Sequence, residues 1–118
     1  MTEAPAIRRG DVWLVALDPG TIGSEQRKTR PCVVVQRDAA NAASPTTIVV
    51  PVTDGAGRRP SPISIPLAPG ASGLTKASIA LCGQLRAVDR SRLISRLGAL
   101  DAAGIEAVNA GVRAILDL

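Results

Sequence analysis

The sequence predicts an α+β domain in which a small curled antiparallel sheet precedes helices. Short apolar runs rich in Val and Ile, separated by Gly, Pro and Asn, fill the first three quarters of the chain, as is typical of strands joined by turns. After Val88 the apolar residues recur with helical spacing. With 118 residues, 46% of them hydrophobic, the chain fits one compact domain over residues 1–118, and we expect residues 1–8 to be flexible.

Three buried strands are predicted first. Residues 11–17 form a short β-branched run that ends before a Pro-Gly pair, and residues 32–37 and 46–53 have the same character. We expect that a small sheet does not wholly bury the third run. The segments after the second and third runs, residues 38–45 and 54–62, are rich in small residues, Gly and Pro, and are predicted as loops.

The following segments predict a sheet edge and a bend. Residues 63–67 include Pro66, which cannot donate a hydrogen bond to a ladder, so this strand is expected at an edge. Residues 78–88 form either two short strands or one bent strand, and Gly83 is the natural place for the bend.

Two helices are predicted after the strands. Asp89 is placed to cap a helix over residues 90–97, and Asp101 is placed to cap a helix over residues 102–116. The apolar residues that share one face of the second helix are Ile105, Val108, Val112 and Ile115.

The charge and the aromatic content narrow the possible partners. The formal net charge is +4 and the pI about 10, carried by twelve arginines and two lysines, which favours nucleic acid or an acidic protein segment. The alternative is a solvated basic surface whose arginines reflect a GC-rich genome. Single-strand binders usually stack bases on aromatic rings, and Trp13 is the only aromatic residue. We expect Trp13 in the core rather than on a stacking surface.

Several chemistries are excluded because their residue types are missing. The chain has no histidine, so neither a Ser-His-Asp triad nor a pair of imidazoles can form, and it has no CxxC, HExxH or GxxxxGK[ST] motif. Cys32 and Cys82 lie in apolar runs and are expected to be buried thiols. We expect no metal and no cofactor. Without an apolar leader or a run of about 18 apolar residues, a cytoplasmic protein that crosses no membrane is expected.

The segment GSEQRKTRP, residues 23–31, is the most informative loop. Pro31 disfavours helical geometry at Arg30, so Arg30 is expected in an extended backbone at the mouth of a buried strand. The alternative is a charged hairpin loop that keeps a sheet edge soluble. In residues 46–53 the period of two places Thr53 on the face opposite to Val52, at the strand's end. A hydroxyl beside a fixed guanidinium is a suitable phosphate site.

The segments RRGDVWLVALDP, GSEQRKTRPCVVVQ, TTIVVPVT and GLTKASIALCGQLRAVDRSRL, in this order and before a terminal helix, resemble the MazF/PemK family of toxin endoribonucleases. The resemblance runs from about Arg9 to the C-terminus. It implies a small SH3-like β-barrel with C-terminal helices, a homodimer, and metal-independent cleavage of single-stranded RNA at short sequences. It also implies a cognate antitoxin with an acidic, disordered segment that occupies the RNA-binding groove.

The resemblance also assigns roles to residues. The catalytic positions of the family fall on Arg30 and Thr53, and Glu25 is an alternative general base, because a guanidinium stays protonated at neutral pH. The expected RNA-binding residues would contact base edges or phosphates; they are Ser24, Arg27, Lys28, Gln84 and Arg86, with Glu25 as a further base contact. The reaction would be attack of a ribose 2′-OH on the adjacent phosphorus, with loss of the 5′-oxygen.

Two other classes of function stay open. CcdB-like gyrase poisons use the same barrel and contact their target through a tryptophan near the C-terminus, whereas this chain ends in GVRAILDL. A non-catalytic barrel that binds RNA or protein is the second alternative, since a fold does not fix a function.

Overall fold

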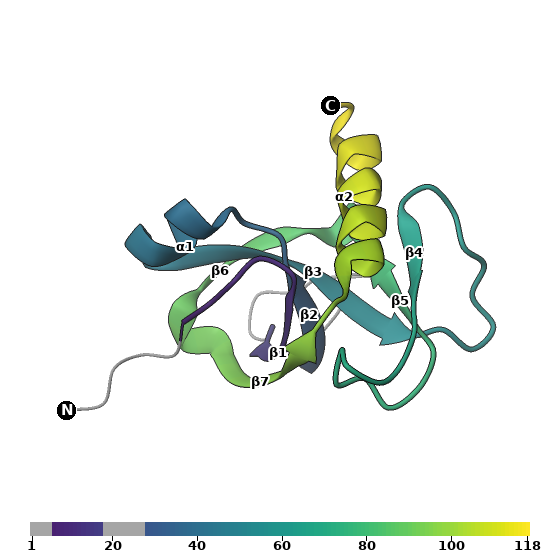
Figure 1. The fold of residues 1–118 in the computed structure, drawn as a ribbon, viewed down its shortest axis with the longest axis horizontal. Helices are drawn as coiled ribbons and strands as arrows, with labels where there is room; N and C mark the ends of the chain where they lie inside the picture. Colours follow the sequence, from purple (N-terminus) through teal and green to yellow (C-terminus); the bar gives the residue numbers. More distant parts are fainter. Residues whose placement is uncertain (1–5, 18–27) are drawn as a thin grey trace.

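The computed structural model describes residues 6–17 and 28–118, which form a mixed α/β fold around an antiparallel sheet (Figure 1). The strands in this part of the chain are β1 Asp11–Ala16, β2 Thr29–Val34, β3 Thr46–Asp54, β4 Ser64–Leu67, β5 Ser78–Leu81, β6 Arg86–Asp89 and β7 Leu93–Ala99. The helices are α1 Asp38–Ala43 and α2 Ala102–Leu116, with single 3-10 turns η1 Cys82–Gln84 and η2 Arg90–Arg92.

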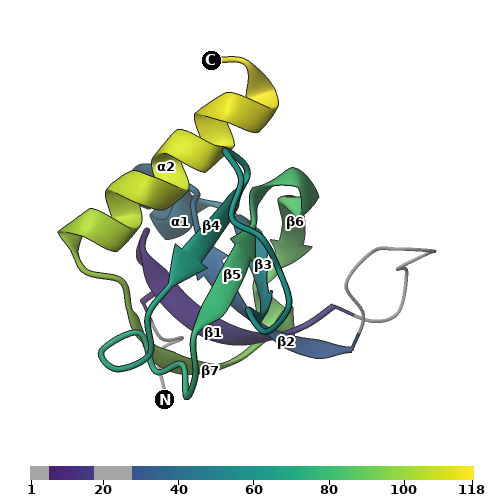
Figure 2. The same cartoon turned by 90° about the vertical axis from the view of Figure 1, so that its right-hand side faces the viewer.

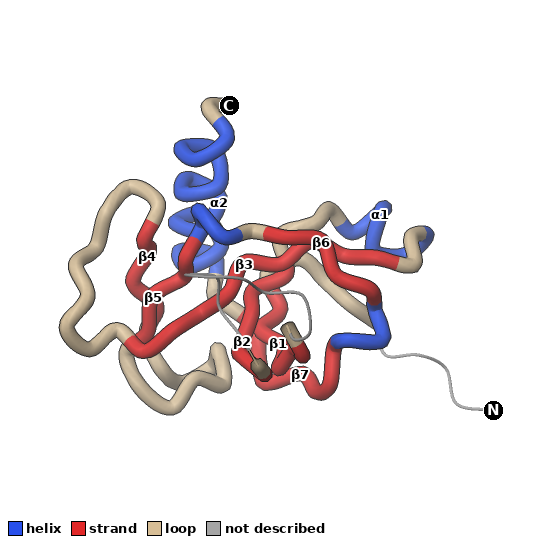
Figure 3. Tube along the Cα trace, turned by 180° about the vertical axis from the view of Figure 1, so that it is seen from behind, coloured by secondary structure: helices blue, strands red, loops and turns tan. Residues whose placement is uncertain are grey.

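The long strand β3 organises the sheet because its two halves have different neighbours. Its first half pairs with β6 and its second half with β5, while β2 pairs with its centre. The strand order is β4-β5-β3-β2-β1-β7, with β6 beside β3. The long loops on either side of β4 gather at the end of the molecule away from α1 (Figure 3).

The two ends of the strand order approach each other through a loop. The Ala99 N–H of β7 donates to the Ala71 carbonyl at 3.1 Å. Gly73 in the same loop has a φ of +78°, and a Cβ there would lie 2.1 Å from the Leu97 carbonyl oxygen. Glycine is therefore required where this loop crosses β7.

Alternating side chains build one apolar cluster on each face of the sheet. The first, the helix-side cluster, lies under α2, which packs against β4 and η1 (Figure 2). It contains Val12, Val33, Val50, Val52, Leu67, Leu74, Ala80, Cys82 and Val108. The second, the Trp13 cluster, contains Ile7, Trp13, Val15, Leu17, Cys32, Val34, Val49 and Val88.

The two clusters test the expected burial of several residues. Trp13 is 4% exposed, so the prediction that it belongs to the core is confirmed. Cys32 and Cys82 are buried, free thiols, as predicted. The apolar run over residues 46–53 is largely but not wholly buried within the chain, because Thr46 is exposed and Ile48 and Thr53 are half-buried.

Most of the sheet and the last helix match the prediction. The strand with Pro66 ends the strand order, and residues 78–88 form two short strands with Gly83 in the turn between them. Helix α2 has the predicted bounds, and its cap Asp101 accepts a hydrogen bond from the Gly104 N–H at 2.8 Å. Its face is buried most deeply at Val108, whereas Ile115 near its end is 39% exposed.

The predicted helix over residues 90–97 was wrong. Asp89 does cap, accepting from the Ser91 N–H at 2.8 Å, but only the single turn η2 follows it. The rest of the segment is strand β7, because it pairs antiparallel with β1. One helix, rather than two, therefore follows the strands.

Two smaller boundaries also differ from the prediction. Residues 38–45 contain the short helix α1 instead of a loop throughout, because Ala is a strong helix former. Strand β2 begins at Thr29 and ends at Val34, so that it starts before Pro31, because pairing with β1 continues past the proline. The predicted flexibility of residues 1–8 falls partly outside the described residues.

Candidate active site

The backbone of Arg30 has the predicted extended conformation. Arg30 lies in β2 opposite Val15 of β1, directly before Pro31. At the end of this hairpin, the Leu17 N–H donates to the Lys28 carbonyl at 2.9 Å, and Lys28 has a φ of 62°. The strand pairing thus fixes the position of Arg30 relative to the sheet.

Arg30 and Thr53 lie at neighbouring ends of β2 and β3. The pairing of these two strands ends with Cys32 opposite Pro51, and Arg30 and Thr53 lie two residues beyond that pair in their strands. Thr53 itself pairs with Ile79 of β5. Both residues line one pocket of about 320 Å³.

Arg30 carries an unsatisfied donor in this region. Its Nε is buried and has no hydrogen-bond partner within the part of the chain that the structure describes. Buried polar groups are nearly always paired, and an unpaired one has a substantial free-energy cost. An anionic oxygen bound beside Arg30 would supply the missing acceptor, so this residue is suited to hold a phosphate.

Arg86 projects from the same face of the sheet as Arg30 and Thr53. It pairs with Val49 of β3, which shares its face with Pro51 and Thr53. Burial raises the pKa of the Cys32 thiol to about 12, and the charge of Arg86 acts in the opposite direction. The guanidinium of Arg86 therefore acts on a thiol only two residues from Arg30.

Of the other predicted RNA-binding residues, two lie in the described part of the chain and three lie outside it. Gln84 lies in η1, two residues before Arg86, and Lys28 is exposed at the end of the β1–β2 hairpin. Ser24, Glu25 and Arg27 lie outside the described residues.

The sequence analysis did not single out an ion pair that borders the pocket. Lys76 Nζ lies 2.9 Å from Asp54 Oδ2, and both residues line the pocket with Arg30 and Thr53. A hydrogen bond from the Ala56 N–H, followed by the interaction with Lys76, lowers the pKa of Asp54. These two positions are 22 residues apart in sequence, and the pairing of β3 with β5 brings them together.

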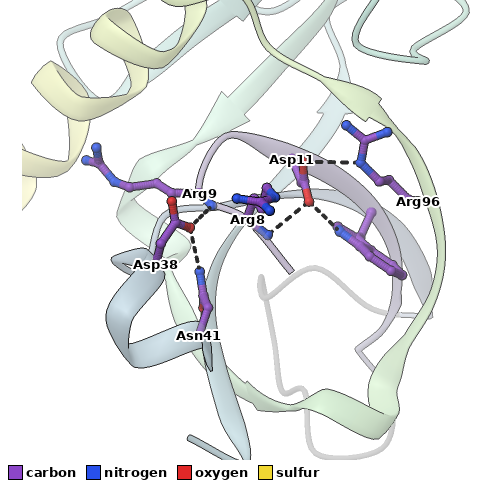
Figure 4. Close-up of polar contacts among 7 residues, drawn as sticks. Arg8, Arg9, Asp11, Asp38, Asn41 and Arg96 are labelled. Carbon is purple, nitrogen blue, oxygen red and sulfur yellow. Dashed lines mark hydrogen bonds and ion pairs between the residues drawn. The ribbon is translucent and has the colours of Figure 1, made fainter. Parts of the chain in front are cut away.

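A second polar site lies at the beginning of β1, around Asp11 (Figure 4). Asp11 begins β1, is 3% exposed, and accepts hydrogen bonds from the Arg8 N–H at 3.0 Å and from Trp13 Nε1 at 3.3 Å. Its other oxygen lies 3.2 Å from Arg96 Nε. Beside this site, the Arg9 N–H donates to Asp38 Oδ1 at 2.7 Å.

The described residues contain neither a metal-binding cluster nor a helix that could span a membrane. Within residues 6–17 and 28–118, no group of three or more His, Cys, Asp or Glu residues is arranged to hold a metal ion. In the same part of the chain, no helix is both long and apolar enough to cross a membrane.

Solved structures share this fold along nearly the whole chain. A crystal structure of MazF from Deinococcus radiodurans is 24% identical, has a TM-score of 0.81, and is matched over 98% of this chain and 100% of its own. An endoribonuclease in complex with its cognate antitoxin, from a Mycobacterial species, is 23% identical with a TM-score of 0.76, over 98% of this chain and 97% of its own.

The sequence comparisons identify the family. A curated relative, the endoribonuclease MazF of Staphylococcus epidermidis, is 42% identical over 91 residues, which are 77% of this chain and 75% of the relative. The model of the family described as PemK-like, MazF-like toxin of type II toxin-antitoxin system matches residues 8–116. The chain therefore belongs to the MazF/PemK family of toxins.

Proposed function

We propose that this protein is the toxin of a toxin–antitoxin pair and an endoribonuclease that cuts single-stranded RNA at short specific sequences. Family membership supports this function, and so does the name of the 42% identical relative. The observation that carries the site assignment is the pocket that Arg30 and Thr53 line together. The buried Arg30 Nε, which has no acceptor among the described residues, supports it.

The proposed reaction uses the substrate's own 2′-OH as the nucleophile. Attack on the adjacent phosphorus forms a 2′,3′-cyclic phosphate and breaks the bond to the 5′-oxygen, while negative charge collects on the equatorial phosphate oxygens. Arg30 stabilises this charge and gives a proton to the leaving oxygen. Thr53 donates a hydrogen bond that holds a phosphate oxygen or the attacking hydroxyl in line.

The proton of the 2′-OH needs an acceptor other than Arg30. We assign this role to Glu25, which lies between β1 and β2 in the sequence, with contact to an RNA base as its alternative role. Ser24 and Gln84 would contact base edges, and Arg27, Lys28 and Arg86 would contact phosphates. The position of Arg86 on the same face as Arg30 and Thr53 supports its share of this assignment.

The proposal extends to the partners and the architecture. The antitoxin would bring an acidic, disordered segment to the basic RNA-binding surface, so the antitoxin and RNA would compete. We further propose a cytoplasmic homodimer in which residues 1–118 form one domain of the SH3-like barrel type. The exposed side chains of Ile94, Ile115, Leu116 and Leu118 support an interface between two chains.

Cleavage in excess EDTA tests the proposed mechanism. We expect RNA to be cut under these conditions with 5′-hydroxyl ends, and a 2′-deoxy substitution at the cleaved nucleotide to abolish cutting. Thr53→Val, which keeps the branched shape but removes the hydroxyl, should lower the rate about tenfold, the effect of one hydrogen bond, without lowering the melting temperature. Cleavage that stops in EDTA, or 5′-phosphate ends, would contradict the mechanism.

The same assay separates the alternative classes of function. A gyrase poison would leave the RNA intact and inhibit supercoiling, whereas a non-catalytic barrel would bind RNA or protein without cutting either. The match to the PemK-like, MazF-like family favours the nuclease.

A further inference from the structure

The ion pair at the rim of the pocket is held by the backbone on both sides. Asp54 Oδ1 accepts a hydrogen bond from the Ala56 N–H at 3.0 Å, which fixes the carboxylate, and its Oδ2 lies 2.9 Å from Lys76 Nζ. The Gly55 N–H donates to the Ala77 carbonyl at 3.1 Å, beside the pairing of Asp54 with Ser78.

Lys76 is anchored independently of its partner carboxylate. The hydroxyl of Ser78, a residue that is 6% exposed, donates to the Lys76 carbonyl at 2.9 Å. The side chain of Lys76 is nevertheless 64% exposed, so its backbone is fixed while its ammonium faces solvent. An ammonium has three N–H donors, so one bond to Asp54 leaves it able to bind a further anion.

Stability alone does not explain a carboxylate and an ammonium at this place. Ion pairs as exposed as this one contribute little to the free energy of folding. An uncompensated Asp54 directly after Thr53 would repel a polyanionic substrate, and Lys76 cancels that charge at the rim of the same pocket. The charge of Arg58 in the next loop also acts on Asp54 and lowers its pKa further.

We propose that Lys76 is an additional phosphate-binding residue of this pocket, positioned by Asp54, that holds the RNA phosphodiester next to the one that is cut. This inference rests on the proposed function for the identity of the ligand. Arg30 and Thr53 engage the reacting phosphate, and Lys76 binds its neighbour across the rim. Lys76 therefore contributes to RNA affinity and register rather than to the chemical step.

The salt dependence of binding tests this inference directly. The probe is an RNA with a 2′-deoxy substitution at the cleaved nucleotide, and the logarithm of its binding constant is measured against the logarithm of salt concentration. For single strands the slope changes by about 0.7 for each neutralised phosphate. We expect Lys76→Gln to reduce the slope by about 0.7 and to raise KM for cleavable RNA with kcat unchanged, whereas Lys76→Arg keeps the native slope.

Two further variants complete the test. Arg113→Gln removes a cation from another exposed ion pair, with Glu106 on α2 at 4.0 Å, and should leave the slope unchanged. In the Lys76→Gln background Asp54 is an unpaired carboxylate facing the RNA, so adding Asp54→Asn should recover part of the affinity but none of the slope. Melting temperatures should remain within a few degrees of the native value for every variant.

The outcomes separate this inference from the proposed function. A native protein that cuts RNA, together with a Lys76→Gln variant of unchanged slope, would overturn the role of Lys76 and leave the nuclease assignment standing. A native protein that binds the RNA but cuts none would overturn the nuclease assignment, while a slope reduced by about 0.7 would still support the phosphate contact. A native protein that does not bind RNA would overturn both.

Discussion

Two buried polar groups beside the Trp13 cluster differ in their hydrogen bonding: the carboxylate of Asp11 has partners, and the Nε of Arg30 has none among the described residues. At the beginning of β1, the buried carboxylate of Asp11 is surrounded by donors from Arg8, Trp13 and Arg96 (Figure 4). In β2, the buried Nε of Arg30 has no acceptor among the described residues. The first site is satisfied by the fold itself, whereas we propose that a ligand supplies the missing acceptor at the second. The contrast separates polar residues that stabilise this sheet from those available for chemistry.

The largest effect on the cleavage rate is expected from a substitution of Arg30. Arg30→Met keeps the aliphatic stem of the side chain but removes the guanidinium, so we expect the cleavage rate to fall by about 10²–10³-fold, as for the loss of an oxyanion donor. Because a buried donor without an acceptor is removed, the melting temperature should be equal to or higher than that of the native protein.

Arg96→Ala is the matched control for Arg30→Met, because Arg96 is an arginine with a partner in the fold. This variant should keep the native cleavage rate per folded molecule. Equal rate losses in the two arginine variants would remove the distinction between the two sites.

An intermediate effect, on the free energy of unfolding, is expected from a substitution of Asp11. Asp11→Ala leaves the Trp13 Nε1 and the Arg8 N–H without their acceptor, and should lower the free energy of unfolding by about 2–3 kcal/mol. Denaturant titration measures this loss, and single-turnover cleavage at saturating RNA should show a native rate for the folded fraction. A stable Asp11→Ala variant with a low rate would instead place Asp11 in the chemistry.

The smallest effect is expected at Asp89, an exposed carboxylate at the end of β6. Hydrogen bonds from the Ser91 hydroxyl and backbone N–H lower its pKa. Because the folded-state pKa lies below the unfolded one, this contribution to stability is present above about pH 4 and is lost as the pH falls through the folded pKa. Asp89→Asn should therefore flatten the decline of melting temperature below about pH 4. An identical decline in both proteins would assign the acid sensitivity to other carboxylates.

The sequence predicted the parts of the fold that depend on strong local patterns. Strand β1, the edge strand with Pro66 and helix α2 each combine a clear period with a distinct start or stop signal. The segment after Asp89 has two readings, because Leu93 and Leu97 fit both a helical spacing of four and a strand period of two. Pairing with β1 decides in favour of β7, and no local signal could have supplied that information.

The candidate site was predictable to the extent that it lies on strands. The proline after Arg30 and the alternation before Thr53 indicated positions near strand ends, where both residues lie, and both line one pocket. The pair of Asp54 and Lys76 depends on the pairing of β3 with β5, which is a long-range contact, so it could not be read from either segment alone.

The two buried cysteines allow local opening of the structure to be measured at two places without a substitution. Cys32 lies two residues from Arg30, and Cys82 lies beneath α2, where Gly111 leaves room for its sulfur. Burial raises the pKa of both thiols, to about 12 and about 11. Because a thiol reagent attacks an exposed thiolate, each cysteine reacts through local opening of the structure around it. The ratio of the two labelling rates therefore compares the local opening of the structure around Cys32 with that around Cys82.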